Sequence, residues 1–526
     1  MFPFLRFYID NPDTFSYLAV AGKYFAGDFH GALNGTWSPM ISWLLSLVLF
    51  TGMDPVLLFK ILQVILGGIG IVLASLLIDR FKMTRIRSIL LKVSLVPVLL
   101  SYSLLLCSPD LLFLDLLMVI HLLLLRKNSL SMRNSFRIGL SGALLYLAKA
   151  YGILFFPLLC LFFYALLFFS GKEKSFRQSV AKSLAVSLAV FVILSAGWVA
   201  MISSKYHRFT ISDAAGYNFL TAANEAKSGV VNHPILTNGL LDPTPNGSLF
   251  AWEDPALYTG GINSVLEHWD PGQRMQVLRS NLMSLYYYQY RHQIGWLFLL
   301  SCLIGLALLR EKKIAFAFVL CLFTAVVFPC GYLVIYLAPR YIWILSVLMA
   351  ILIFYVADLF AVERKNWISF PLVLLCILFL VKRPLKEILW REDLEKSSAE
   401  LFQGITHPLA TLQQTYETDR LAYAIADSLA KRKDLKGNVA GYLNPAGSSR
   451  DSYSLTLFLC YRLGNPYFGQ IAGSALQATG IKPLVDHGIK FFYVWGEAAQ
   501  KKDSLLNFPV TFEDPKNGLR IYRLMP

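Results

Sequence analysis

Apolar runs separated by short polar loops fill the middle of this chain. Several of them approach the roughly 20 residues that a helix needs to cross a bilayer. The predicted membrane helices of this kind cover residues 55–78, 88–106, 110–125, 183–203, 293–309, 314–337, 340–359 and 367–381. The pattern therefore predicts a polytopic helical membrane protein.

One further apolar run, residues 138–170, is too long for a single crossing. A helix of that length would measure roughly 50 Å against a hydrocarbon core of about 30 Å. Lys149 and the dipeptide Tyr151-Gly152 interrupt it, which predicts two helices with Lys149 at the bend and about ten membrane helices in all. The run 37–50 is too short to span and is expected to lie along the interface.

Basic side chains concentrate in the loops after the first, third, fifth and seventh predicted helices. All four loops fall on one side of the membrane if 138–170 crosses twice, and the positive-inside rule makes that side cytoplasmic. The acidic N-terminal stretch, the loop 204–292 and the C-terminal tail are then expected to face outward. The basic residues are Arg80, Lys82, Arg85, Arg87, Arg126, Lys127, Arg133, Arg137, Lys172, Lys174, Arg177, Lys182, Arg310, Lys312 and Lys313.

Composition supports the membrane class. Hydrophobic residues make up 56% of the chain and charged residues only 15%, with a mean hydropathy of +0.54, whereas charged residues approach about a quarter of a soluble protein. The net charge of +15 would suit a nucleic-acid partner, but its placement in loops indicates membrane topology and no nucleic acid. Seven cysteines without a CxxC pair indicate neither a zinc site nor a disulfide framework.

The tail differs from the rest of the chain. Gly and Pro punctuate alternating helical and strand-like patterns there, which predicts a soluble α/β domain over residues 382–526, following a membrane domain over residues 1–381. Within the tail we expect a helical region at 399–433, strands near 439–443, 489–495 and 519–524, and a helix near 454–463.

The stretch from Asp10 to Trp43 carries the candidate chemistry. On a helix starting near Pro12, Asp13 and Tyr17 are four residues apart and share one face. A carboxylate held there, in an outward catalytic loop covering residues 10–50, could serve as a general base or a metal ligand. Alternatively, Asp10 and Asp13 are first-turn acids that complement the helix dipole.

The run DTFSYLAVAGKYFAGDF, the run NGTWSPMISWLL and the following helix that ends in basic residues resemble the first outward loop of the GT-C glycosyltransferases. This polytopic class includes the protein O-mannosyltransferases and the lipid A aminoarabinose transferases. Its members place an Asp, followed by a Tyr or His one turn later, just after their first helix. The segments 108–120, 142–157 and 338–350 are also similar, and the likeness covers most of residues 10–381 in order and spacing.

The resemblance implies an inverting glycosyltransferase on the outer face of a membrane, the bacterial inner membrane being the expected one. Its donor would be a polyprenyl-phosphate sugar and its acceptor a lipid, a glycan or a protein. Asp13 would act as the base that deprotonates or orients the acceptor, with Asp10 as its helper. The family also has a helix before the acidic motif, whereas MFPFLRFYI lacks a long apolar core, so the resemblance implies that a first helix is missing.

Two cations are placed to bind the donor phosphate. Arg340 and Lys149 lie at the outer ends of predicted spans, where a cation is a functional candidate, and only Arg340 offers bidentate contacts. Both could instead extend to lipid headgroups. Asp110 opens a span at its outer end, where it could bind a divalent cation such as Mg²⁺ or Mn²⁺, support the Lys149 region, or act as a plain helix N-terminal acid.

Aromatic and loop residues complete the predicted site. Tyr17, Trp37 and Tyr341 could stack against a sugar or an isoprenoid, or serve as ordinary interfacial aromatics. His233 and the cluster Trp252-Glu253-Asp254 in the long loop could shape the acceptor site, or be ordinary loop residues. His, Asp and Glu show no ligand pair at fixed spacing, so the sequence does not establish a metal site.

Two other functions fit a polytopic chain. A transporter or flippase of a phosphate-bearing lipid could use the same cations, but the sequence has neither repeated halves nor matching broken helices. A non-catalytic scaffold that presents the tail explains the loop and the tail but leaves the positions of Asp13, Lys149 and Arg340 unused. The sequence favours the transferase.

Overall fold

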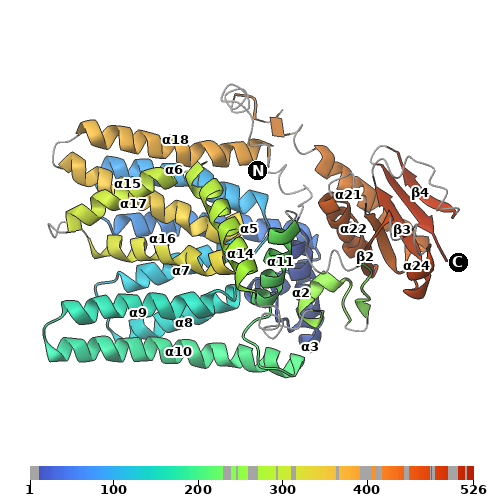
Figure 1. The fold of residues 1–526 in the computed structure, drawn as a ribbon, viewed down its shortest axis with the longest axis horizontal. Coiled ribbons are helices and arrows are strands. Elements are labelled where there is room, and N and C mark those ends of the chain that lie inside the picture. Colours follow the sequence, from blue (N-terminus) through green and yellow to red (C-terminus); the bar gives the residue numbers. More distant parts are fainter. Residues whose placement is uncertain are drawn as a thin grey trace.

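The computed structural model of this protein describes most of the chain. The described residues are 11–228, 239–244, 247–258, 270–291, 294–309, 315–362, 366–390, 406–408, 411–412, 417–443, 449–473, 476, 480–495, 508–515 and 518–525. They form a long helical bundle with a sheet domain at one end (Figure 1).

Each of the predicted membrane segments is a helix in the bundle. Seven helices in the described part of the chain are long and apolar enough to cross a membrane, whereas α7, α8 and α15 are shorter. The protein is therefore a multi-pass membrane protein. The bundle helices are α5 (Pro55–Asp79), α6 (Arg85–Leu105), α7 (Asp110–Leu124), α8 (Met132–Ala148), α9 (Gly152–Ser170), α10 (Lys174–Tyr206), α15 (Gly295–Leu309), α16 (Phe316–Val334), α17 (Trp343–Val362) and α18 (Asn366–Trp390).

The break inside the run 138–170 lies where the sequence predicts it. Helix α8 ends at Ala148, Lys149 has an extended backbone, and α9 begins at Gly152. The reversal is tight, because a Cβ atom on Gly152 would come within 2.7 Å of the Leu145 backbone. Only glycine fits such a close approach, so α8 and α9 can pack side by side with Lys149 at the tip of the turn.

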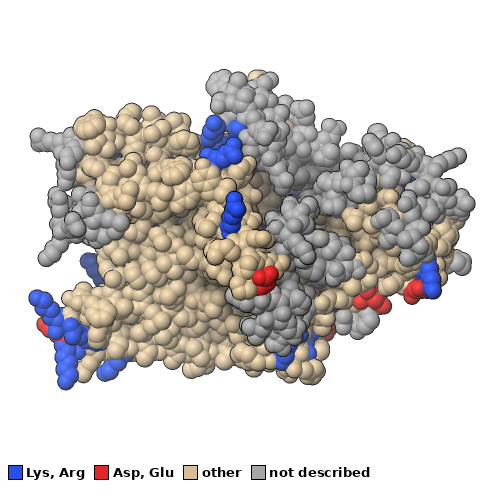
Figure 2. Space-filling view, in the orientation of Figure 1, with Lys and Arg blue, Asp and Glu red and all other residues tan. Residues whose placement is uncertain are grey.

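Basic side chains gather at the end of the bundle farthest from the sheet domain (Figure 2). At this end Arg87, at the start of α6, contacts Asp358 near the end of α17 at 3.2 Å, and its other guanidinium nitrogen donates to Ser369 of α18 at 3.0 Å. The described part of the predicted basic loops thus shares one end of the bundle, opposite the sheet domain.

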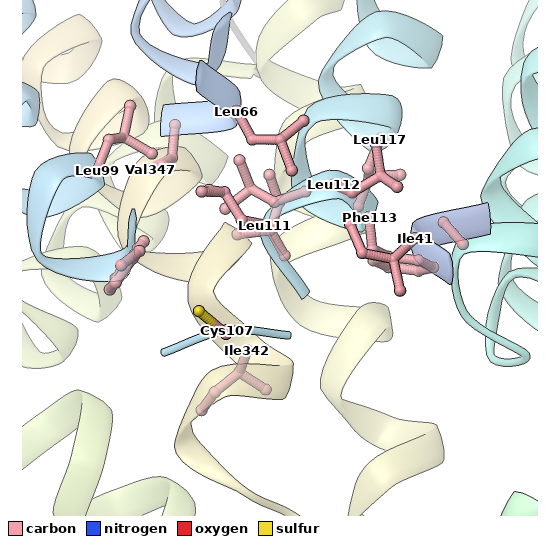
Figure 3. Packing of buried hydrophobic residues seen from close by; sticks show 14 of the residues in the cluster. Ile41, Leu66, Leu99, Cys107, Leu111, Leu112, Phe113, Leu117, Ile342 and Val347 are labelled. Carbon is pink, nitrogen blue, oxygen red and sulfur yellow. The ribbon is translucent and has the colours of Figure 1, made fainter. Parts of the chain in front are cut away.

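The core of the bundle surrounds α17. Every residue of this helix from Ile344 to Asp358 is buried, as expected for a helix that is apolar all round and enclosed by others. Figure 3 shows Val347 of α17 beside Leu99 of α6, with Leu66 and Leu111 close by. This packing fixes α7, which begins at the candidate site residue Asp110, and α17, which directly follows the turn η6 that carries Arg340.

A layer of shorter helices covers the end of the bundle nearest the sheet domain. Asn11 caps the first of them by accepting the Asp13 N–H at 3.2 Å, and Pro12 occupies its first turn. The layer consists of α2 (Pro12–Phe25), α3 (Phe29–Ala32), α4 (Met40–Ser46), η1 (Leu49–Thr51), α11 (Ala214–Ser228), η3 (Ala251–Glu253), η4 (Pro255–Leu257), α14 (Pro271–Leu285), the π-helical turn η5 (Tyr286–Arg291) and η6 (Pro339–Ile342).

The sheet domain contains five strands in the order β2-β1-β3-β5-β4. Strand β1 pairs in parallel with β2 and β3, whereas β5 is antiparallel to β3 and β4. The sequence patterns locate β1, β3, β5 and α22 but miss β2 and β4. The elements are α21 (Glu417–Ala430), η7 (Lys433–Leu435), β1 (Val439–Leu443), α22 (Ser449–Leu463), β2 (Tyr467–Ala472), α24 (Lys482–Asp486), β3 (Phe491–Trp495), β4 (Val510–Asp514) and β5 (Leu519–Arg523).

Helix α18 continues beyond residue 381, where the sequence places the end of the last span. It runs to Trp390, so Lys382 and Arg383 lie within a helix. Arg383 pairs with Glu387 one turn later at 2.7 Å and donates to the Tyr288 carbonyl at 3.0 Å. These partners explain how Arg383 is accommodated near the end of α18.

Candidate active site

Four charged side chains from four separate segments meet at the end of the bundle nearest the sheet domain. Arg340 of η6 forms an ion pair with Asp13 of α2, and its Nε lies 3.5 Å from Oδ2 of Asp110 at the start of α7. Lys149, in the turn between α8 and α9, forms an ion pair with the other oxygen of Asp110. The formal charges cancel, so the group is an electrically balanced cluster with Arg340 between two carboxylates.

Asp13 is held on a rigid element. It lies in the first turn of α2, and only 7% of its surface is exposed. The next residue, Thr14, ties the helix to the connection between α6 and α7 by donating its hydroxyl to the Cys107 carbonyl at 3.0 Å. Oδ1 of Asp13 accepts the indole N–H of Trp252 at 3.1 Å, while Oδ2 faces Arg340.

Asp110 is held by a side chain from its own segment. Ser108 lies two residues before Asp110, the first residue of α7, and donates its hydroxyl to Oδ2 of Asp110 at 2.9 Å. Because the other oxygen faces Lys149, Asp110 holds the turn that carries this lysine. Asp110 thus orients one cation and shares the other with Asp13.

Aromatic rings enclose the cluster. The Lys149 ammonium lies 3.4 Å from the centroid of the Tyr341 ring and 5.6 Å from that of Tyr332, distances typical of cation–π contacts. On the other side, the rings of Tyr17 and Trp37 lie 5.3 Å apart, edge to face. Seven of the residues that the sequence singles out therefore collect in one place: Asp13, Tyr17, Trp37, Asp110, Lys149, Arg340 and Tyr341.

Tyr17 keeps its proton in this setting. Burial raises the pKa of its hydroxyl well above the usual value, and the neighbouring Asp13 carboxylate raises it further. A phenol of this kind can donate a hydrogen bond but does not supply a base. Of these two residues on the same face of α2, Asp13 is the one suited to accept a proton.

The remaining predicted site residues lie elsewhere. Glu253 is buried, forms an ion pair with Lys23 of α2 and accepts the Leu249 N–H at 3.0 Å, so it fastens its loop to α2. Asp10 and His233 lie outside the described residues. Trp252, predicted with its neighbours as a possible part of the acceptor site, instead contacts Asp13, which lies 239 residues away and which no local pattern joins to it. Ser108 was not predicted as a site residue.

Burial lowers the pKa of Lys149 to about 8, although the neighbouring Asp110 carboxylate opposes this. The ammonium is therefore charged below pH 8 and loses its proton as the pH rises through that value. If Lys149 binds an anionic donor, kcat/KM for the donor should fall above about pH 8. Lys149→Arg, whose side chain stays charged, should remove this alkaline limb. A limb unchanged in Lys149→Arg would assign it to another group.

The cluster does not fit a divalent cation in this arrangement. All four carboxylate oxygens of Asp13 and Asp110 face N–H or O–H donors, which Mg²⁺ or Mn²⁺ would have to displace. Among the described residues, no group of three or more His, Cys, Asp and Glu could hold a metal ion. We expect EDTA to leave the reaction rate unchanged. A loss of activity that Mn²⁺ restores would show that the cluster rearranges around a metal.

Comparison with known proteins identifies the fold. No protein-family profile and no curated protein sequence matches the chain. Among solved structures, it resembles ArnT from Cupriavidus metallidurans bound to undecaprenyl phosphate, with a TM-score of 0.52 and 12% identity over 99% of this chain and 95% of ArnT. The apo state of ArnT gives 0.51 and 13%, over 98% and 94% of the two chains.

A second neighbour is AglB, the archaeal oligosaccharyltransferase from Archaeoglobus fulgidus, in complex with an inhibitory peptide and a dolichol-phosphate. Its TM-score is 0.50 with 11% identity, over 92% of this chain and 65% of AglB. ArnT and AglB are both GT-C glycosyltransferases. The likeness confirms the predicted architecture: the chain has the GT-C fold, with a small sheet domain at its C-terminal end.

Proposed function

We propose that this protein is a membrane glycosyltransferase that moves a sugar from a polyprenyl-phosphate donor to an acceptor on the outer face of the membrane. The observation that carries the proposal is the charge cluster, in which Arg340 and Lys149 stand beside a buried carboxylate, Asp13, at one end of a GT-C fold. A base next to two phosphate-binding cations is what a transfer from a phosphate-linked sugar requires.

In the proposed reaction the donor phosphate competes with Asp13 for Arg340. As Arg340 and Lys149 turn to the phosphate oxygens, Oδ2 of Asp13 is freed to accept a proton from an acceptor hydroxyl or amine. The acceptor attacks the anomeric carbon of the sugar, the bond from that carbon to the phosphate oxygen breaks, and the electron pair leaves with polyprenyl phosphate. A single displacement of this kind inverts the anomeric centre.

The donor class agrees with two neighbours, because ArnT was solved with undecaprenyl phosphate and AglB with a dolichol-phosphate. The acceptor class stays open among lipid, glycan and protein. The proposed orientation rests on charge: basic residues gather at the end of the bundle opposite the cluster, and the positive-inside rule makes that end cytoplasmic. The cluster and the sheet domain would then face outward, in the bacterial inner membrane or its equivalent.

The test is a mass-spectrometric profile of lipids and surface glycans in cells that lack the protein, complemented with the natural chain or with Asp13→Asn. We expect the knockout to lose one sugar from a surface molecule and to accumulate a polyprenyl-phosphate sugar, and Asp13→Asn not to restore the profile. Flippase activity, the alternative function, predicts instead that the donor builds up on the cytoplasmic side only and that Asp13→Asn restores the profile.

A further inference from the structure

The segment 247–253 is held between the sheet domain and α2. On the sheet side, Tyr467 at the start of β2 donates its N–H to the Leu249 carbonyl at 2.7 Å, and Phe250 forms a parallel bridge with Tyr467. Leu241 donates its N–H to the Phe468 carbonyl at 2.8 Å. Since β2 is the edge strand of the sheet, this part of the outward loop extends the sheet by main-chain pairing.

Two residues after Phe250, the same segment forms a hydrogen bond with α2. The Trp252 carbonyl accepts the Ser16 hydroxyl at 2.8 Å and the Trp37 indole N–H at 3.1 Å. The Trp252 indole is 3% exposed and lies edge-on to the rings of Trp37 and Tyr217, at 5.6 and 5.1 Å. Its ring is fixed by these contacts, and its N–H donates to Oδ1 of Asp13.

The sheet domain also contacts α2 directly. The ring of Phe15, two residues after Asp13, lies 5.8 Å from that of Phe458 and 5.6 Å from that of Tyr461 on α22. The next residue of α22, Arg462, forms an ion pair with Asp54, the N-cap of α5. The domain therefore touches the helix that carries Asp13 from one side and reaches Asp13 itself through segment 247–253 from the other.

We propose that the C-terminal domain positions Asp13 for catalysis, with Trp252 as the positioning residue. The edge of the sheet fixes segment 247–253, and the indole N–H of Trp252 fixes Oδ1. The second oxygen then stays directed at the site of transfer when the donor phosphate draws Arg340 away. This inference rests on the proposed function, and it gives the tail a catalytic purpose.

Trp252→Phe tests the hydrogen bond, because it removes the N–H and retains an aromatic ring. We expect kcat to fall about 10- to 100-fold, the loss typical when a reacting group is slightly misplaced, with the donor KM changed by less than about twofold. The matched control is Trp198→Phe, a buried indole of α10 that contacts Trp43 and not Asp13; it should leave both kcat and the donor KM unchanged.

A double-mutant cycle tests the role of the sheet domain. Leu241→Pro removes one N–H that joins the loop to β2 and alters neither Trp252 nor Asp13. If the domain acts through Trp252, Leu241→Pro should lower kcat in the natural chain and cause little further loss in Trp252→Phe, because coupled residues are not additive. Losses that multiply, or no effect of Leu241→Pro on a protein with an unchanged melting temperature, would overturn the role of the domain.

The outcomes separate this inference from the proposed function. If the natural chain transfers no sugar from any polyprenyl-phosphate donor, the proposed function fails. If the natural chain is active and Trp252→Phe behaves like Trp198→Phe, the proposed function stands and the positioning role of Trp252 fails.

Discussion

Replacing Asp13 by Asn is expected to abolish sugar transfer while the protein still inserts, folds and binds its donor. The change is nearly isosteric: Oδ1 can still accept the Trp252 N–H, and the side chain still lies in the first turn of α2. What it loses is the ability to take a proton, and a general base typically contributes about 10²- to 10⁴-fold to the rate. We expect kcat to fall by that factor in a purified, reconstituted protein, with the donor KM no higher than in the natural chain.

The chain offers a matched control for this change. Asp358 is also a buried carboxylate paired with an arginine, Arg87, but it lies at the opposite end of the bundle. Asp358→Asn therefore makes the same chemical change in a similar setting and should lower thermal stability without lowering kcat. If Asp13→Asn retains more than a tenth of the natural kcat, Asp13 is not the base and serves only as a first-turn acid of α2.

Much of the candidate site could be predicted from the ends of the membrane spans, because residues at those ends lie near a membrane surface. Apolar length locates the bundle helices, and the residues at their outer ends, Asp110, Lys149 and Arg340, must then lie near one surface. The break at Lys149 follows from the mismatch between a long apolar run and the bilayer. Helical spacing also places Asp13 and Tyr17 on one face. These inferences need only the local pattern of the sequence and the known thickness of a bilayer. They do not depend on which distant segments meet.

The contacts between distant segments could not be predicted in the same way. Asp13 and Arg340 are 327 residues apart, and Asp13 and Trp252 are 239 apart, so no spacing rule joins them. Strand β2 was missed because its burial depends on pairing with β1 and on cover from the outward loop. The extension of α18 to Trp390 was missed because Lys382 and Arg383 break the apolar run, although Arg383 has partners in Glu387 of the same helix and the Tyr288 carbonyl beside it.

The charge balance of the cluster explains how one site can hold a base and bind an anion. Two carboxylates and two cations are mutually satisfied before the donor arrives. In the proposed reaction the donor phosphate adds negative charge and draws Arg340 away from Asp13 and Lys149 away from Asp110. Asp13 would thus stay paired with Arg340 while no donor is bound, and would become free to accept a proton once the donor phosphate is bound. This coupling makes Arg340 the residue on which both functions depend.

Arg340→Ala should therefore lower kcat/KM for the donor more than Lys149→Ala, the same change at the other cation of the cluster. It removes the group that bridges Asp13 and Asp110 and the only guanidinium in the cluster, which offers bidentate phosphate contacts. We expect kcat/KM for the donor to fall about 10²- to 10³-fold, the range for loss of a donor that stabilises developing negative charge. Lys149→Ala should cost about tenfold, since Arg340 remains, and Arg340→Lys should fall between the two.

The control for Arg340→Ala is Arg87→Ala, which breaks the corresponding arginine–aspartate pair at the far end of the bundle. Both variants should lower the melting temperature, because each leaves a buried carboxylate without its partner, but only Arg340→Ala should lower kcat/KM. Equal effects of the two on transfer would mean that Arg340 stabilises the fold and does not bind the donor. A greater loss in Lys149→Ala than in Arg340→Ala would move the phosphate to the Lys149 side of the cluster, away from Asp13, and would break the link between donor binding and release of the base.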